Sequence, residues 1–311
     1  MASQEVTRSV LLAGSMFTGC GDDNGGGPAL LKISDLEGSW NTTTYTVTSR
    51  TGEKVTIDLI ELGAAFSFEV ADDGSFEGRF FLPAAMKHFP PQGKQEETPA
   101  GDFALIDQDT ILINVMPDIP PLLTDTRGAF TLDGKTLSFT DTDAMLDLDG
   151  DQQPDPAIAE ATLELYSGDR NAVIFIEDFE GHWEAQEYRM TSKANPQRTF
   201  EIIAAGATLE MDIDSGGDFT GDLFLPSAVT QGDPVTIDDF LGSLEIDYQD
   251  TVRTLFTPEH EPFLTNTYGP FTLDGDRVEI SDDNTTFDFG FGDGEEPVLF
   301  EGVMERTGKA K

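Results

Sequence analysis

Apolar and polar residues alternate along much of the chain, which is the pattern of strands that bury one face. In residues 66–71 every second side chain is apolar, 72–74 supplies a tight Asp-Asp-Gly turn, and 75–82 returns with alternating apolar positions. Residues 208–225 show the same pattern. Many short antiparallel strands of this kind predict an all-β protein, built as a closed barrel or a sandwich.

The apolar faces of these strands are the candidate interior. A small barrel has a lumen just wide enough for packed side chains or for one small ligand. These side chains therefore either line an apolar pocket or fill the core. The residues expected to face the lumen are Phe66, Phe68, Phe76, Phe80, Leu209, Met211, Phe219 and Leu223.

The chain contains two copies of one unit. The sequence Asp-Leu-Glu-Gly-Ser-Trp at 35–40 returns as Asp-Phe-Glu-Gly-His-Trp at 178–183, and Phe-Thr-Leu-Asp-Gly at 130–134 returns unchanged at 271–275. Repeats of this length predict a duplicated domain. We place the first unit at 29–168 and the second at 172–308. The few residues between them predict a short, rigid linker.

Each unit opens with a Gly-x-Trp motif, Gly38 to Trp40 in the first and Gly181 to Trp183 in the second. This motif, at the start of a unit made of hairpins, resembles the lipocalins and the wider calycin group. The resemblance implies two tandem antiparallel up-and-down β-barrels of about eight strands each, with the tryptophan at the closed end. Family barrels often place an arginine of the last strand over that tryptophan. Arg306 fits this role in the second unit, whereas the first unit has Leu165. In the alternative reading, both tryptophans are ordinary core residues of another β fold.

The N-terminus has the features of a lipoprotein leader. Residues 9–21 form an uncharged, largely apolar run that is too short for a membrane span, which needs about 20 residues, and that suits a signal peptide. Phe-Thr-Gly-Cys at 17–20 resembles a bacterial lipobox, with Phe17 in place of the usual leucine. The resemblance implies a signal peptide at 1–19, a lipid on Cys20 and a polar tether at 20–28. It places the protein in the bacterial cell envelope, on a periplasmic or surface face. The alternative is a disordered leader with a chance cysteine.

The charge balance limits the partners. The chain has 18 Lys and Arg against 59 Asp and Glu, a formal net charge of −41. Such a surface repels phosphates, so nucleic acid is excluded as a partner. The charge would steer the protein towards basic partners. It is equally the composition of a protein adapted to high salt.

One acidic stretch is a candidate calcium site. Residues 147–155 carry carboxylates at alternating positions around a glycine, and calcium prefers six to eight oxygen ligands. The stretch resembles the Asp-x-Asp-Gly-Asp-x-x-Pro-Asp repeats of extracellular proteins, and the second unit has lost the alternation. The alternative is a solvated acidic loop. The candidate ligands are Asp147, Asp149, Asp151 and Asp155.

Motifs for catalysis are missing from the sequence. There is no Gly-x-Ser-x-Gly elbow, no Walker loop and no dinucleotide fingerprint, and the many carboxylates single out no pair. We therefore expect no enzyme activity, although a hydrolase among the carboxylates stays an alternative. Two non-enzymatic functions fit. The first is a membrane-tethered binding protein for a small hydrophobic ligand. The second is an accessory or scaffold subunit that docks on a membrane-anchored complex, such as an electron-transfer or transport assembly.

Overall fold

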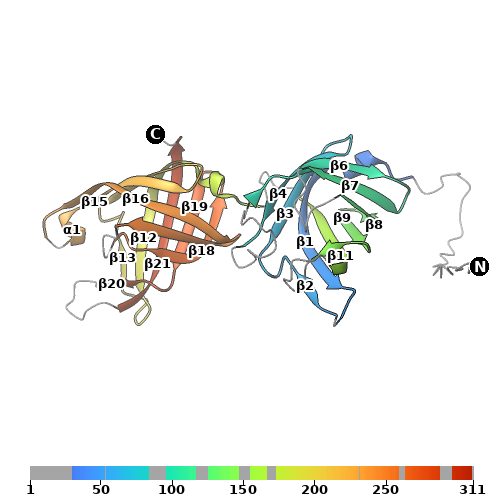
Figure 1. Cartoon of the computed structure of the whole chain (residues 1–311). Coiled ribbons are helices and arrows are strands. Elements are labelled where there is room, and N and C mark those ends of the chain that lie inside the picture. The colour runs from blue at the N-terminus through green and yellow to red at the C-terminus, as the bar shows by residue number, and fades with distance from the viewer. Residues whose placement is uncertain are drawn as a thin grey trace, which may run out of the picture. The chain divides into compact units, whose positions relative to one another are not determined.

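Antiparallel strands make up almost all of the regular structure in the computed structural model (Figure 1). The predicted all-β fold is confirmed, because the strands form two closed antiparallel barrels of eight strands each, in tandem. The residues that the structure describes are 30–52, 54–83, 96–116, 125–146, 155–166, 173–230, 232–258, 263–287 and 296–309. Both barrels belong to the unit Lys32–Lys311.

The first barrel is a meander closed by its own ends. Each strand pairs with the next along the chain, and the first strand, β1, then pairs with the last, β11, from Ser39 opposite Tyr166 to Ser49 opposite Ala157. Three short strands, β2 (Thr56–Asp58), β5 (Glu96–Glu97) and β10 (Met145–Leu146), extend the wall. The eight barrel strands are β1 (Gly38–Ser49), β3 (Ala65–Val70), β4 (Ser75–Phe81), β6 (Ala100–Leu105), β7 (Thr110–Met116), β8 (Thr126–Asp133), β9 (Thr136–Asp141) and β11 (Asp155–Tyr166).

The second barrel repeats this order. Its first strand, β12, pairs with its last, β21, from His182 opposite Gly308 to Ser192 opposite Val298. Short strands β13 (Thr199–Glu201) and β20 (Thr286–Phe287) lie beside them, and α1 (Ser227–Thr230) is a single helical turn. The eight barrel strands are β12 (Gly181–Ser192), β14 (Thr208–Ile213), β15 (Asp218–Leu225), β16 (Val235–Tyr248), β17 (Thr251–Thr257), β18 (Thr267–Asp274), β19 (Arg277–Asp282) and β21 (Glu296–Gly308). Across the described ranges, no helix is long and apolar enough to cross a bilayer.

A tryptophan and a short 3-10 helix occupy the start of each barrel. The helices are η1 (Ile33–Leu36) and η3 (Ile176–Phe179). The indole nitrogen of Trp40 donates to the carbonyl oxygen of Leu36, and that of Trp183 donates to Phe179, both at 2.7 Å. Both tryptophans are completely buried, so these bonds satisfy the one polar atom of each ring.

The glycine of each Gly-x-Trp motif is required by backbone geometry. Gly38 has a φ of +135° and Gly181 has a φ of +152°, which side-chain-bearing residues rarely adopt. A Cβ on Gly181 would lie 2.9 Å from Arg306 and 3.0 Å from a backbone oxygen. The Arg306 guanidinium lies 4.7 Å from the centre of the Trp183 ring, and in the first barrel Leu165 pairs with Trp40 at that place.

Candidate functional site

The first barrel encloses an apolar cavity of about 110 Å³. Its wall comes from strands all around the barrel, and six phenylalanine rings and one tyrosine contribute to it. These rings belong to Phe66, Phe68, Phe76, Phe103, Phe130, Phe139 and Tyr45. The wall also includes small side chains, among them Ala144, Ala159 and Ala161, which leave room between the rings.

Three of the residues expected to face the lumen, Phe66, Phe68 and Phe76, line this cavity. They are packed against one another or against neighbours, for example Phe68 edge-on to Phe76 at 5.4 Å between ring centres. Phe80 is buried too, but it packs against Phe66 at 4.4 Å in a solid cluster with Leu59. Of the four phenylalanines expected to face the lumen of the first barrel, three therefore line the cavity and one belongs to the packed core.

The corresponding pocket among the described residues of the second barrel is smaller, about 60 Å³. Leu209 and Met211 line that pocket, whereas Phe219 and Leu223 lie in the packed core around it. The hydroxyl of Tyr188 donates to the carbonyl of Phe263, which ties a loop segment to the lumen wall.

Strand register identifies one side chain that contributes to this difference. In the first barrel Asp141 of β9 pairs with Ala159 of β11, and in the second Asp282 of β19 pairs with Phe300 of β21. Ala159 and Phe300 therefore occupy equivalent positions. The Phe300 ring packs edge-on to Tyr188 at 4.9 Å and fills space that Ala159 leaves open.

The cavity in the first barrel contains one carboxyl group among its described lining residues, that of Asp141. This side chain is only 8% exposed. Burial raises its pKa, the nearby charge of Asp143 adds to the rise, and a 2.8 Å hydrogen bond from the Asp143 backbone N–H opposes it. Tyr45 also lines the cavity, and burial together with the Asp141 charge raises the pKa of its hydroxyl.

The equivalent carboxyl in the second barrel is held by the protein itself. Asp282 accepts bonds from the backbone N–H of Asn284 at 2.7 Å and of Tyr268 at 3.2 Å, and from the hydroxyl of Thr285 at 3.1 Å. The backbone oxygen of Thr285 accepts a hydrogen bond from the backbone N–H of Val298 in β21. The backbone oxygen of Ala144 accepts one from Ala157 in β11 in the same way, so Thr285 and Ala144 occupy equivalent positions. The first barrel thus has no hydroxyl where the second has Thr285.

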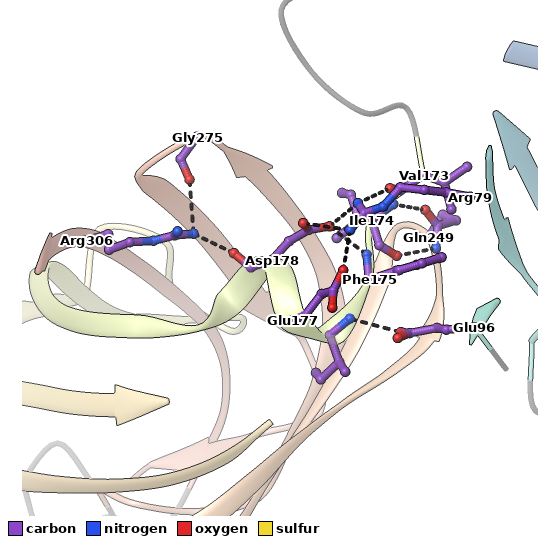
Figure 2. A network of polar contacts seen from close by, with 11 residues as sticks. Arg79, Glu96, Val173, Ile174, Phe175, Glu177, Asp178, Gln249, Gly275 and Arg306 are labelled. Carbon is purple, nitrogen blue, oxygen red and sulfur yellow. Dashed lines mark hydrogen bonds and ion pairs between the residues drawn. The ribbon is translucent and has the colours of Figure 1, made fainter. Parts of the chain in front are cut away.

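A polar network outside the lumen joins β4 to the segment that precedes β12 (Figure 2). Both terminal nitrogens of Arg79 donate to the carboxylate of Asp178, at 2.6 and 3.0 Å, and Arg79 also reaches Glu177 at 3.0 Å and the Val173 carbonyl at 2.9 Å. Its guanidinium lies 4.2 Å from the centre of the Phe175 ring.

Neighbouring side chains extend this contact. The carboxylate of Glu96 accepts a 2.9 Å bond from the backbone N–H of Ile176 (Figure 2). Alternation along β4 predicts an outward Phe81, yet Phe81 is completely buried, in a cluster with core residues of the second barrel such as Phe175. The outer face of β4 is therefore an internal contact surface, which alternation alone does not reveal.

Several predicted site residues lie outside the described residues. These are Cys20 and three of the candidate calcium ligands, Asp147, Asp149 and Asp151. The fourth, Asp155, is the first residue of β11, and its carboxylate accepts a 3.3 Å bond from the hydroxyl of Thr51. Within the described ranges, no group of three or more His, Cys, Asp or Glu side chains is arranged to hold a metal ion.

Sequence reasoning missed the two positions at which the lumens differ, Ala144 and Ala159, and it did not assign Asp141 to the lumen. The signal was present in the repeat, since aligning the last strands places Ala159 opposite Phe300 and Ala144 opposite Thr285. It also missed Arg79, whose equivalent in the second unit is Asp222. Nothing local in the sequence indicates that the partners of Arg79 lie in the other unit.

Comparisons with known proteins add little. The chain matches no protein-family model and no curated protein sequence. Among solved structures it is similar to a protein of unknown function from the DUF3598 family of Nostoc punctiforme, at 11% identity and a TM-score of 0.26, over 88% of this chain and 97% of that one. It is also similar to a tryptophan-to-alanine mutant of the vaccine antigen Transferrin Binding Protein B from Haemophilus parasuis, at 9% identity and a TM-score of 0.22, over 86% of this chain and 76% of that one. TM-scores this low carry no functional argument, and the architecture rests on the strand pairing.

Proposed function

We propose that the protein is a non-enzymatic binding protein that holds one small apolar molecule in the lumen of its first barrel. In this role the barrel works like those of the lipocalins that the Gly-x-Trp motifs resemble. The second barrel, whose lumen is better filled, serves as a structural partner domain. The observation that carries the proposal is the difference between the two lumens, about 110 Å³ against about 60 Å³.

The size of the cavity limits the ligand. An apolar cavity of about 150 Å³, engineered into another protein, stays dry and binds benzene or xenon. Drug-sized ligands occupy pockets of roughly 300–1,000 Å³. A cavity of about 110 Å³ therefore suits a molecule with a single small ring or a short branched chain, rather than a long fatty acid.

The chemistry of the wall supports binding rather than catalysis. General acid–base work on a substrate usually needs at least one group placed against a second, complementary one. The described lining holds a single carboxyl, Asp141, in a mostly apolar wall to which Thr42, Tyr45 and Thr126 add hydroxyl groups. The proposal therefore assigns no reaction to this site.

The first experiment is a titration of the full chain with methylcyclopentane, followed by methyl NMR. We expect the signals of Ile111 and Val115, which line the cavity, to shift in a saturable way. The variant Ala159→Phe places a ring where the second barrel has one and should abolish the shifts. Leu241→Ala, on an exposed position of the second barrel, is the control and should leave them unchanged. Absent shifts in the unaltered protein, or equal shifts in Ala159→Phe, would contradict the proposal.

The lipobox-like sequence supports a proposal on location. The mature protein would begin at Cys20, carry a lipid there and reach the cell envelope through the tether at 20–28. Expression in a bacterial host tests this by mass spectrometry of the membrane fraction. A lipid-sized mass on the N-terminal peptide that disappears in Cys20→Ser is the expected result, and an unmodified chain of full length in the soluble fraction is the opposite one.

The net charge of −41 favours a second candidate, an accessory subunit that docks on a basic, membrane-anchored protein complex. Purification from the source under mild conditions, followed by native mass spectrometry, distinguishes the accessory subunit from the small-molecule binding protein. Stoichiometric subunits that leave at high salt would favour the accessory role. A stoichiometric small molecule would favour the binding protein.

A further inference from the structure

We infer that the ligand of the first barrel is a small apolar amine, whose ammonium group pairs with the carboxylate of Asp141. The inference rests on the proposed function and specifies the chemical class of its ligand. It follows from where this carboxyl lies, from what its counterpart in the second barrel does, and from the rings around it.

The position of Asp141 is unusual for a charged group. It ends β9, it is 8% exposed, and it forms part of the wall of an apolar cavity. Placing a carboxylate next to apolar surface is costly unless an opposite charge or hydrogen-bond donors compensate it. An ionised carboxylate only accepts hydrogen bonds, so a ligand that meets it inside the cavity must donate.

The second barrel supplies an internal comparison. There the same carboxyl, Asp282, accepts a hydroxyl bond from Thr285, and its cross-strand partner is Phe300. The first barrel has Ala144 and Ala159 at these two positions, and both line the cavity. The two differences together take away one hydrogen-bond donor and one large neighbouring side chain, and the Asp141 carboxyl lines the cavity of the first barrel.

The surroundings of Asp141 favour a cation over a neutral donor. Phenylalanine rings attract ammonium groups through their faces, and the cavity wall contains six of them. Tyr45, which packs edge-on to Phe66 at 5.2 Å, adds a hydroxyl to the same wall. An anionic ligand would meet the Asp141 charge and the field of a chain with a net charge of −41.

The test compares three molecules of similar size and shape on the full chain at neutral pH. They are cyclopentylamine, cyclopentanol and methylcyclopentane, and binding is followed by the methyl signals of Ile111 and Val115. The amine should bind at least tenfold more tightly than the hydrocarbon, with the alcohol between them. Asp141→Asn keeps the shape and removes the charge, and should reduce this preference to less than twofold. Ala144→Thr restores the hydroxyl of the second barrel and should weaken amine binding.

The control is Asp282→Asn, which changes the equivalent carboxyl away from the cavity and should leave the preference intact. Equal binding of amine and hydrocarbon, or a preference that survives in Asp141→Asn, would overturn the inference and leave the proposed function standing. Failure of all three molecules to bind a protein that is folded by circular dichroism would overturn both. Circular dichroism of every variant distinguishes loss of binding from loss of fold.

Discussion

One side chain on the closing strand differs in a way that changes the packing of the two lumens. Ala159 and Phe300 occupy equivalent positions on the closing strands, and each contacts the interior of its barrel. Protein interiors are packed about as densely as organic crystals, so a ring that is absent at such a position leaves a void unless neighbours move in. Ala144 and Ala161, which also line the cavity of the first barrel, are too small to fill this void.

We therefore predict that Phe300→Ala opens the second barrel. The loss of a buried ring at 8% exposure should lower the free energy of unfolding by about 3–4 kcal/mol. Urea denaturation measures this. Leu241→Ala, at 52% exposure, is the matched control and should cost less than about 1 kcal/mol. Equal losses in both variants would mean that the Phe300 ring does not pack as described.

A second prediction concerns Asp141 and pH. Burial raises the pKa of this carboxyl above its ordinary value of 3.8, so the folded state holds the proton more tightly than the unfolded state. The Asp141 contribution to stability is therefore most favourable below pH 3.8 and declines as the pH rises through the raised pKa. Asp141→Asn should remove this decline, so that the variant gains stability relative to the unaltered protein between pH 4 and pH 7. Urea midpoints across this range provide the measurement, and a constant difference between the two proteins would contradict the prediction.

Period-two alternation predicts which face of a strand is buried, and it places Phe66 and Phe76 inside the barrel. It cannot predict whether a buried side chain borders a void, because this depends on how residues far apart in sequence fill the same space. Asp141 and Ala159 illustrate the point, since each looks ordinary within its own strand. Their role becomes visible only when the two units are compared position by position, Asp141 with Asp282 and Ala159 with Phe300.

Among the elements, the start of each barrel is the most constrained. A 3-10 turn, a glycine with positive φ and a buried tryptophan follow one another in the same order in both units. The Gly-x-Trp motif supported the prediction of two antiparallel barrels because it recurs in a duplicated unit whose hairpins are visible in the alternation of apolar residues. The last strands have diverged, and Arg306 covers Trp183 where Leu165 pairs with Trp40.

We predict that Gly181→Ala destabilises the second barrel by about 2–4 kcal/mol, from the strained φ together with contact against a backbone oxygen 3.0 Å away. Gly52→Ala is the control. Gly52 also has a positive φ, +65°, but nothing lies within 4 Å of the added carbon, so only the strain of about 1 kcal/mol applies. Thermal unfolding of both variants measures the loss of stability. A smaller loss of stability in Gly181→Ala than in Gly52→Ala would contradict the prediction.

At the scale of the whole molecule, Arg79 connects parts of the chain that belong to different repeats. Its side chain is 13% exposed and forms charge-assisted bonds with Asp178 and Glu177, while Phe81 of the same strand is buried in a shared cluster. The predicted short linker lies outside the described residues, and these side chains are where the repeats contact each other.

We predict that Arg79→Ala lowers the free energy of unfolding by about 2–3 kcal/mol, because it leaves the partly buried carboxylate of Asp178 without its cation. Arg277→Ala is the matched control. Arg277 also contacts two carboxylates, but it is 41% exposed, so its removal should cost less than about 1 kcal/mol. Urea unfolding of the full chain measures both, and equal losses would argue against a buried role for Arg79.

The way in which each barrel closes has a consequence for folding. A barrel is complete only when its first strand meets its last, and in the first barrel Ser39 must find Tyr166 across the whole repeat. Such distant pairing slows folding and leaves the opening strand with an unpaired edge in the meantime. The chain contains a second closing strand of related sequence, β21, so a newly synthesised β1 has two possible pairing partners, β11 and β21. Synthesis from the N-terminus, with the first repeat complete before the second emerges, is what would keep the two barrels from exchanging strands.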